Sequence, residues 1–179
     1  WGPPDGRATT FQLPDNVASA IHYCVTRGRG GKGIPIFWAA GNGNETVTTD
    51  GYASNPEVMA IAASTDADTK AYYSDTGAPI FLAAPSSGQS QLNQRRIFTI
   101  DRQGAAGYNG GDSTNGDASG NYWNHFGGTS SAAPLTAGVG ALILSANPQL
   151  TAAEVREILR QTADKIGAPS DYDGGGHSD

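Results

Sequence analysis

Residues 127–144, with the sequence GGTSSAAPLTAGVGALIL, constrain the fold more than any other part of the chain. This segment contains no charged residue, and its apolar side chains fall on every face of a 3.6-residue period. We therefore predict a buried helix that passes through the centre of the protein. Because a proline is tolerated in the first turn of a helix, Pro134 predicts a start near Thr129 or Ser130.

This start places Ser130 at the positive end of the predicted helix. Free backbone N–H groups and the helix dipole stabilise an oxyanion at such an end, which acyl transfer through a serine nucleophile requires. A lone serine before a helix is also the usual N-cap residue, so its position alone leaves both interpretations open.

The remaining sequence alternates predicted helices and strands with short connections. We predict helices over 14–27 and from a Thr151–Glu154 capping box to about 166, strands over 34–40, 58–64, 80–84 and 96–101, a strand or strand end over 71–75, a turn over 28–33, and a long surface loop over 104–124. The strand over 34–40 is almost continuously apolar, as in a parallel sheet covered on both faces. The pattern predicts an α/β fold with a mostly parallel sheet and helices on both faces.

Charge and cysteine content limit the possible partners. The net charge of −6 argues against nucleic acid and anionic membranes and favours a cationic ligand. The chain's single cysteine, Cys24, excludes an internal disulfide. We also expect no membrane span, because no apolar run reaches the required length. The 179 residues are enough for one domain with a core.

Two segments resemble the subtilases, the subtilisin-like serine proteases. GTSSAAP at 128–134 resembles their nucleophile segment, most closely in the kexin and furin branch. AAGN at 39–42 resembles the segment whose asparagine donates a hydrogen bond to the oxyanion. The resemblance implies that Ser130 is the nucleophile and that Asn42 is the oxyanion donor.

Two further segments resemble the kexin and furin branch in particular. WGPPD at 1–5 is similar to a strand that binds the backbone of the substrate and is followed by an acidic pocket residue, and DGY at 50–52 is similar to a second acidic segment of that pocket. YYSD at 72–75 matches a position where the branch carries a calcium ligand. The resemblance thus implies catalytic Ser130 and Asn42, substrate-binding Trp1, Gly2, Asp5, Ala40, Gly41 and Asp50, and a structural calcium ion on Asp5, Asp75 and Glu45.

The resemblance covers nearly the whole chain but only the later part of a subtilase domain. We therefore expect residues 1–179 to be the C-terminal portion of a single catalytic domain, since the family's D-[ST]-G and H-G-T motifs are not present here. His125 lies five residues before Ser130, yet we do not take it as the base, because the family's catalytic histidine comes from a separate helix far upstream. A serine hydroxyl is a poor nucleophile without a base, so this chain alone is expected to be inactive.

The resemblance implies a serine endopeptidase that cleaves after Arg or Lys once the upstream Asp and His complete it. The alternatives are a broad-specificity protease of the subtilisin type and a catalytically dead binding module. Expected partners are a protein or peptide substrate, a propeptide, chaperone or protein inhibitor, and the N-terminal part of the same domain. The family resemblance also implies a secreted or extracytoplasmic location.

Overall fold

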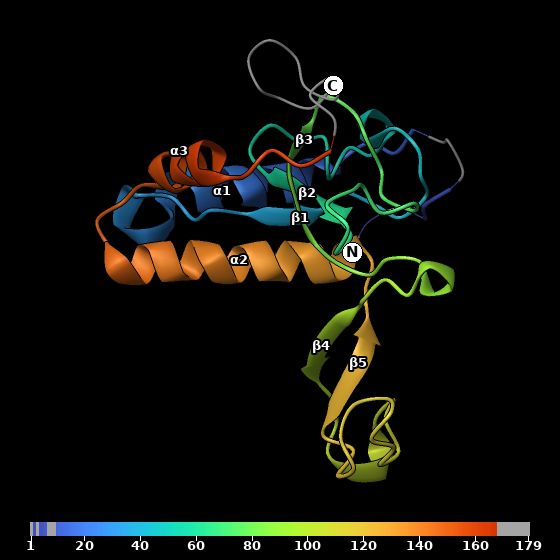
Figure 1. Ribbon diagram of the computed structural model, residues 1–179. Coiled ribbons are helices and arrows are strands. Elements are labelled where there is room, and N and C mark those ends of the chain that lie inside the picture. Colours follow the sequence, from blue (N-terminus) through green and yellow to red (C-terminus); the bar gives the residue numbers. More distant parts are fainter. Residues whose placement is uncertain (1, 3, 7–9, 168–179) are drawn as a thin grey trace.

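The computed structural model describes residues 2, 4–6 and 10–167. Three parallel strands form the central sheet in the order β1 (Phe37–Ala39), β2 (Met59–Ser64) and β3 (Ile80–Pro85). The long helices are α1 (Asp15–Gly31), α2 (Thr129–Ala146) and α3 (Ala152–Thr162). Figure 1 shows α2 running along the sheet and contacting all three strands. The predicted α/β fold with a parallel sheet is confirmed.

The central strand β2 is buried along its whole length. On one face, Ile61 and Ala63 pack in a core cluster with Ala132 of α2 and Val155 of α3. On the other face, Ala60 packs in a second cluster that includes Val47 and Ala53. Burial of both faces explains why this strand is continuously apolar instead of alternating with polar residues.

The predicted turn after the first helix is also present. The backbone leaves the helical conformation at 28–30, where Arg29 and Gly30 have φ values of 53° and 67°. The Arg29 guanidinium fastens this turn to the segment before α3, because its two terminal nitrogens donate to the carbonyl oxygens of Leu150 and Pro148, each over 2.9 Å. These bonds hold this turn against the segment that leads into α3.

Helix α2 differs from the expectation of burial on every face. It begins at Thr129 as predicted, although Pro134 lies in its second turn. Three of its large apolar side chains are exposed, namely Leu135 (44%), Val139 (44%) and Leu142 (70%). By length and composition α2 could also span a membrane, contrary to the prediction, but a core helix of a soluble protein passes the same test. The sequence pattern correctly indicated that α2 is apolar on all its faces. Within the described residues, other parts of the chain cover only some of these faces.

Two other segments depart from the prediction. Residues 71–75 form turns rather than a strand, because Ser74 N bonds back to the Ala71 carbonyl oxygen. The predicted surface loop contains the start of β5 (Tyr122–Phe126), which pairs with β4 (Ile97–Ile100) in an antiparallel hairpin that projects from the body in Figure 1. Short 3-10 helices complete the fold at η1 (Val47–Thr49), η2 (Ser90–Leu92) and η3 (Gly104–Ala106).

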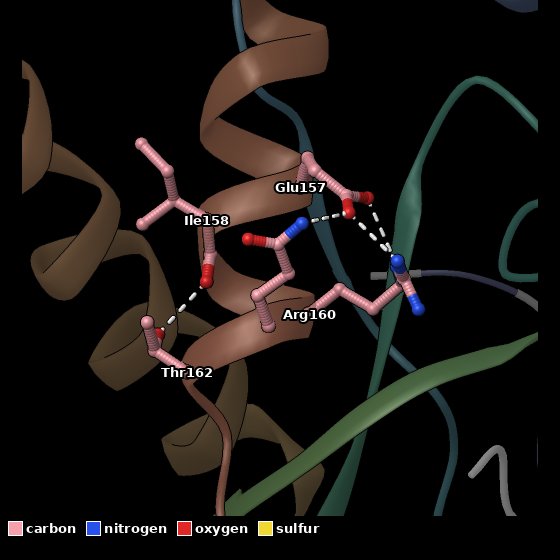
Figure 2. Close-up of polar contacts among 5 residues, drawn as sticks. Glu157, Ile158, Arg160 and Thr162 are labelled. Carbon is pink, nitrogen blue, oxygen red and sulfur yellow. Dashed lines mark hydrogen bonds and ion pairs between the residues drawn. The ribbon is translucent and has the colours of Figure 1, made fainter.

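Helix α3 has the predicted capping box but ends at Thr162, before the predicted end near 166. Figure 2 shows its polar contacts: Arg160 pairs with Glu157 over 2.7 Å, and the Thr162 hydroxyl donates to the Ile158 carbonyl oxygen over 2.8 Å. The Arg160 hydrogen bond lowers the pKa of Glu157 to about 2. The ion pair is exposed on both sides and therefore contributes little to stability.

The capping box gives a direct stability prediction. Thr151→Ala should lower the free energy of unfolding by about 1 kcal/mol, because the lost hydroxyl accepts a hydrogen bond from Glu154 N. Thr162→Ala is the matched control at the other end of α3, with an expected change within about 0.5 kcal/mol. Urea unfolding followed by circular dichroism measures both. Equal losses in the two variants would contradict the capping role.

Candidate active site

The candidate site lies where the carboxyl ends of two parallel strands meet the start of α2. The chain leaves β1 into the loop 40–45, and Gly41 N donates to the Thr129 hydroxyl over 3.2 Å. It leaves β3 into Ser86, whose hydroxyl donates to the Gly128 carbonyl oxygen over 2.7 Å. Ligands of open α/β sheets bind beside this end of the strands, so the sheet itself indicates where a substrate would lie.

Two adjacent serines near the start of α2 have opposite environments. Ser130 is exposed, whereas Ser131 is 2% exposed and its hydroxyl bonds to the Gly128 carbonyl oxygen. The backbone N–H groups of a helix's first turn have no acceptor within the helix. Thr129 N donates to Asn42 Oδ1 and Ser131 N to the Gly128 carbonyl oxygen, which leaves Ser130 N available to a negatively charged oxygen. Of the two hydroxyls, only that of Ser130 is open to solvent.

Asn42 lies beside this helix start, held through its side-chain oxygen. The Thr129 backbone N donates to Asn42 Oδ1 over 2.8 Å, and the Thr129 hydroxyl donates to the same atom over 3.1 Å. A backbone N–H can only donate, so the acceptor must be the amide oxygen, and this fixes the orientation of the Asn42 side chain. The Asn42 amide nitrogen is thereby left to donate to another acceptor.

Three carboxylates surround the same loop. Asn42 N donates to Asp5 Oδ2 over 2.8 Å, and Gly43 N and Glu45 N donate to Asp75 Oδ1 over 2.9 and 3.0 Å. Ligand oxygens of Asp5, Glu45 and Asp75 all lie within 4.8 Å of one another. Oxygens that share one calcium ion lie about 2.3–2.6 Å from it, so this spacing fits a single ion.

Electrostatics of this cluster also favour a cation. Asp75 is 3% exposed, and burial raises its pKa, with the neighbouring charges of Asp5 and Glu45 acting in the same direction. Three carboxylates this close repel one another unless a cation or protons neutralise them. Calcium binds to hard oxygen ligands and takes six to eight of them, so carbonyl groups or water would complete the set. The residues present therefore fit the implied ion.

Asp50 lies next to the N-terminal segment. Its Oδ1 accepts a hydrogen bond from Tyr52 N over 2.8 Å, and a Cβ built on Gly2 would lie 3.7 Å from its Oδ2. Burial raises the pKa of Asp50, and the charge of Asp5 raises it further. The two aspartates expected in one pocket thus interact electrostatically, although they come from separate segments.

The remaining candidate residues have less direct placements. Trp1 lies outside the described residues. Ala40 is fully buried, which leaves only its backbone to contact a substrate, and Gly41 lies against Asp75 with a φ of 119°. His125 Nε2 lies 2.9 Å from Asn115 Oδ1 on the hairpin, so it has a partner other than Ser130.

Sequence reasoning missed the residues that orient the site. Thr129 holds Asn42, and Ser86 and Ser131 hold the Gly128 carbonyl group. Tyr73 adds a hydroxyl 2.8 Å from Ser86 Oγ. One signal could have found Ser86, because it directly follows an apolar strand, at the end of the sheet where sites form.

Known proteins are similar to this chain in sequence and fold. A calcium-dependent protease of Trichormus variabilis is 47% identical over 175 residues, covering 93% of this chain and 26% of the relative. Furin-1 of Xenopus laevis is 32% identical over 171 residues, covering 93% of this chain and 19% of the relative. The crystal structure of a serine protease of Aeromonas sobria superposes with a TM-score of 0.76 at 25% identity, covering 94% of this chain and 33% of that one.

The chain therefore spans about a quarter of the length of the first of these relatives. The sequence profile of the subtilase family, peptidase S8, matches residues 1–177, nearly the whole chain. The matched range includes both Ser130 and Asn42. Fold and sequence agree that the chain belongs to the subtilase family.

Proposed function

We propose that this chain is the nucleophile-bearing part of a serine endopeptidase. One observation carries the proposal: the exposed Ser130 directly follows Thr129, whose N–H and hydroxyl both bond to Asn42 Oδ1. That contact uses the amide oxygen of Asn42, so the amide nitrogen remains available as a donor to an oxyanion. A purely structural turn residue does not need this orientation.

In the proposed reaction, Ser130 Oγ attacks the carbonyl carbon of the scissile bond and loses its proton to a base. The carbonyl oxygen becomes negatively charged, and the Asn42 amide nitrogen and the backbone N–H of Ser130 stabilise that charge. The amine then leaves with the proton, and water releases the acyl group from Ser130. We propose that the base and its carboxylate come from the N-terminal part of the same catalytic domain.

We propose a preference for Arg or Lys before the scissile bond. The charges of Asp50 and Asp5 make the electrostatic potential around the two carboxylates more negative, and burial disfavours the charged form of Asp50. A cationic side chain would neutralise this charge, whereas a neutral one would leave it unpaired. The resemblance of the segments at 1–5 and 50–52 to the kexin and furin branch supports the same preference.

We also propose that a calcium ion binds to Asp5, Glu45 and Asp75. The spacing of their oxygens and the raised pKa of Asp75 support it, as does the similarity to a protease named calcium-dependent. When bound, the ion would neutralise the negative charge of the carboxylates around the loop that carries Asn42. This chain's part is to supply the carboxylates and to hold Asp75 through the N–H groups of Gly43 and Glu45.

A broad-specificity protease and an inactive binding module are the alternatives. The first would keep Ser130 and Asn42 but would not depend on Asp50. The second would have no need for an oriented oxyanion donor.

We also propose partners and a location for the protein. The partners are a propeptide, chaperone or protein inhibitor, and the N-terminal part of the same domain. The location is secreted or extracytoplasmic.

The first prediction concerns the nucleophile of the full-length protein. A fluorophosphonate probe should label Ser130, and Ser130→Ala should abolish both labelling and turnover. Ser131→Ala is the matched control and should still be labelled, because the buried Ser131 hydroxyl is not accessible to the probe. Peptide mapping by mass spectrometry identifies the labelled residue, and label on Ser131 would refute the assignment.

The second prediction concerns specificity. Asp50→Asn should lower kcat/KM for Arg substrates by about 30-fold to 5,000-fold, the range expected when one partner of a buried charge pair is lost. Leu and Phe substrates should change far less. Asp68→Asn makes the same charge change at an exposed position and should leave the specificity unaltered. A wild type that prefers large apolar residues would point instead to the broad-specificity alternative.

The third prediction concerns calcium and pH. In excess chelator at neutral pH, Asp75→Asn should have a higher Tm than the wild type, because it removes a buried charge. Burial raises the pKa of Asp75 in the folded state, so as pH falls the folded protein takes up this proton before the unfolded chain does. Protonation stabilises the folded wild type and does not affect the Asp75→Asn variant. The difference in Tm between the two proteins should therefore narrow as pH falls through the raised pKa.

Calcium should reverse the order at neutral pH. At about 100 times its dissociation constant, the ion adds about 2.7 kcal/mol to the stability of the wild type. The variant should gain much less, because it lacks one ligand. Thermal unfolding of both proteins with calcium and with chelator, at several pH values, measures these differences in Tm. Equal calcium shifts in the two proteins would exclude Asp75 as a ligand.

A further inference from the structure

A network of buried hydroxyls holds the residue that precedes α2. The Gly128 carbonyl oxygen accepts hydrogen bonds from Ser86 Oγ over 2.7 Å, Ser131 Oγ over 2.9 Å and Ser131 N over 2.9 Å. Ser86 and Ser131 are only 4% and 2% exposed. Because the Ser86 proton lies on the Gly128 carbonyl oxygen, the Tyr73 hydroxyl, 2.8 Å away, donates to Ser86 Oγ and anchors the network in a separate turn.

The carbonyl group held by this network shares a peptide unit with a donor of the active site. The Gly128 C=O and the Thr129 N–H belong to one planar peptide and point in opposite directions. Fixing the carbonyl on the Ser86 side therefore aims the N–H at Asn42 Oδ1, 2.8 Å away. Gly128 has a φ of 77°, and a glycine backbone rotates more freely than others, so this peptide needs such a restraint.

We propose that Ser86 is a positioning residue for the oxyanion site. It touches no reacting atom, and it acts through the peptide between Gly128 and Thr129 and then through Asn42. The chain of contacts runs from the carboxyl end of β3 to the carboxyl end of β1 across the start of α2. The inference rests on the proposed function, because it gives Asn42 the role of oxyanion donor.

A double-mutant cycle in the full-length protein tests the inference. Ser86→Ala should lower kcat by about 2- to 10-fold with KM unchanged, the range that one net hydrogen bond allows. In an Asn42→Ala background, the same change should alter kcat by less than about 2-fold, because the residue through which Ser86 acts is gone. Thr136→Val is the matched control: it removes a different buried hydroxyl, on α2, which within the described residues bonds to the Ala132 carbonyl oxygen and not to Gly128.

A second measurement needs no turnover. Amide hydrogen exchange by NMR should be faster at Thr129 in Ser86→Ala than in the wild type, and unchanged at Thr129 in Thr136→Val. Equal effects of Ser86→Ala in both backgrounds, a change confined to KM, or unaltered exchange at Thr129 would overturn the inference. Failure of the proposed function is distinct, because Ser130→Ala would then retain the wild-type turnover.

Discussion

The contact between Asn42 Oδ1 and Thr129 joins the end of β1 to the start of α2 across 87 positions of sequence. It is one of few bonds that connect these two segments, and it sets the orientation of an amide group whose two ends are otherwise alike in shape. Thr129 is fully buried and also accepts a bond from Gly41 N, so its side of the contact is shielded from water, whereas Asn42 is exposed. A Cβ at position 128 would lie 3.1 Å from Asn42 Oδ1, which explains why glycine precedes the helix.

The same loop combines this rigid contact with unfavourable charge. Asp5 accepts the backbone N–H of Asn42, and Asp75 accepts those of its neighbours Gly43 and Glu45. These hydrogen bonds favour the ionised carboxylates, while burial and mutual repulsion oppose them, and for Asp75 the opposing effects are larger. The loop that carries the proposed oxyanion donor is thus also the part of the site most sensitive to cations and protons.

Short-range chemistry made much of the fold predictable. The start of α2, the capping box at Thr151 and the apolar strand β2 each follow from residues that are close in sequence. The orienting network of Ser86 and Ser131 did not, because its bonds span 42 and 45 positions and depend on how the end of β3 meets α2. Periodicity likewise revealed that α2 is apolar all round but not which neighbours cover it. The roles proposed for Asn42 and Ser130 rest on family resemblance, since an asparagine in a turn and a serine at a helix start are common.

The exposed side of α2 has a consequence for how such a chain behaves in water. Leu135, Val139 and Leu142 lie on neighbouring turns of one helix and leave an apolar stripe open to solvent in the described residues. Removing apolar surface from water is favourable, so another segment or a second molecule that covers the stripe would bind there. Where this stripe stays uncovered, self-association should therefore increase with protein concentration, whatever the stability of the fold.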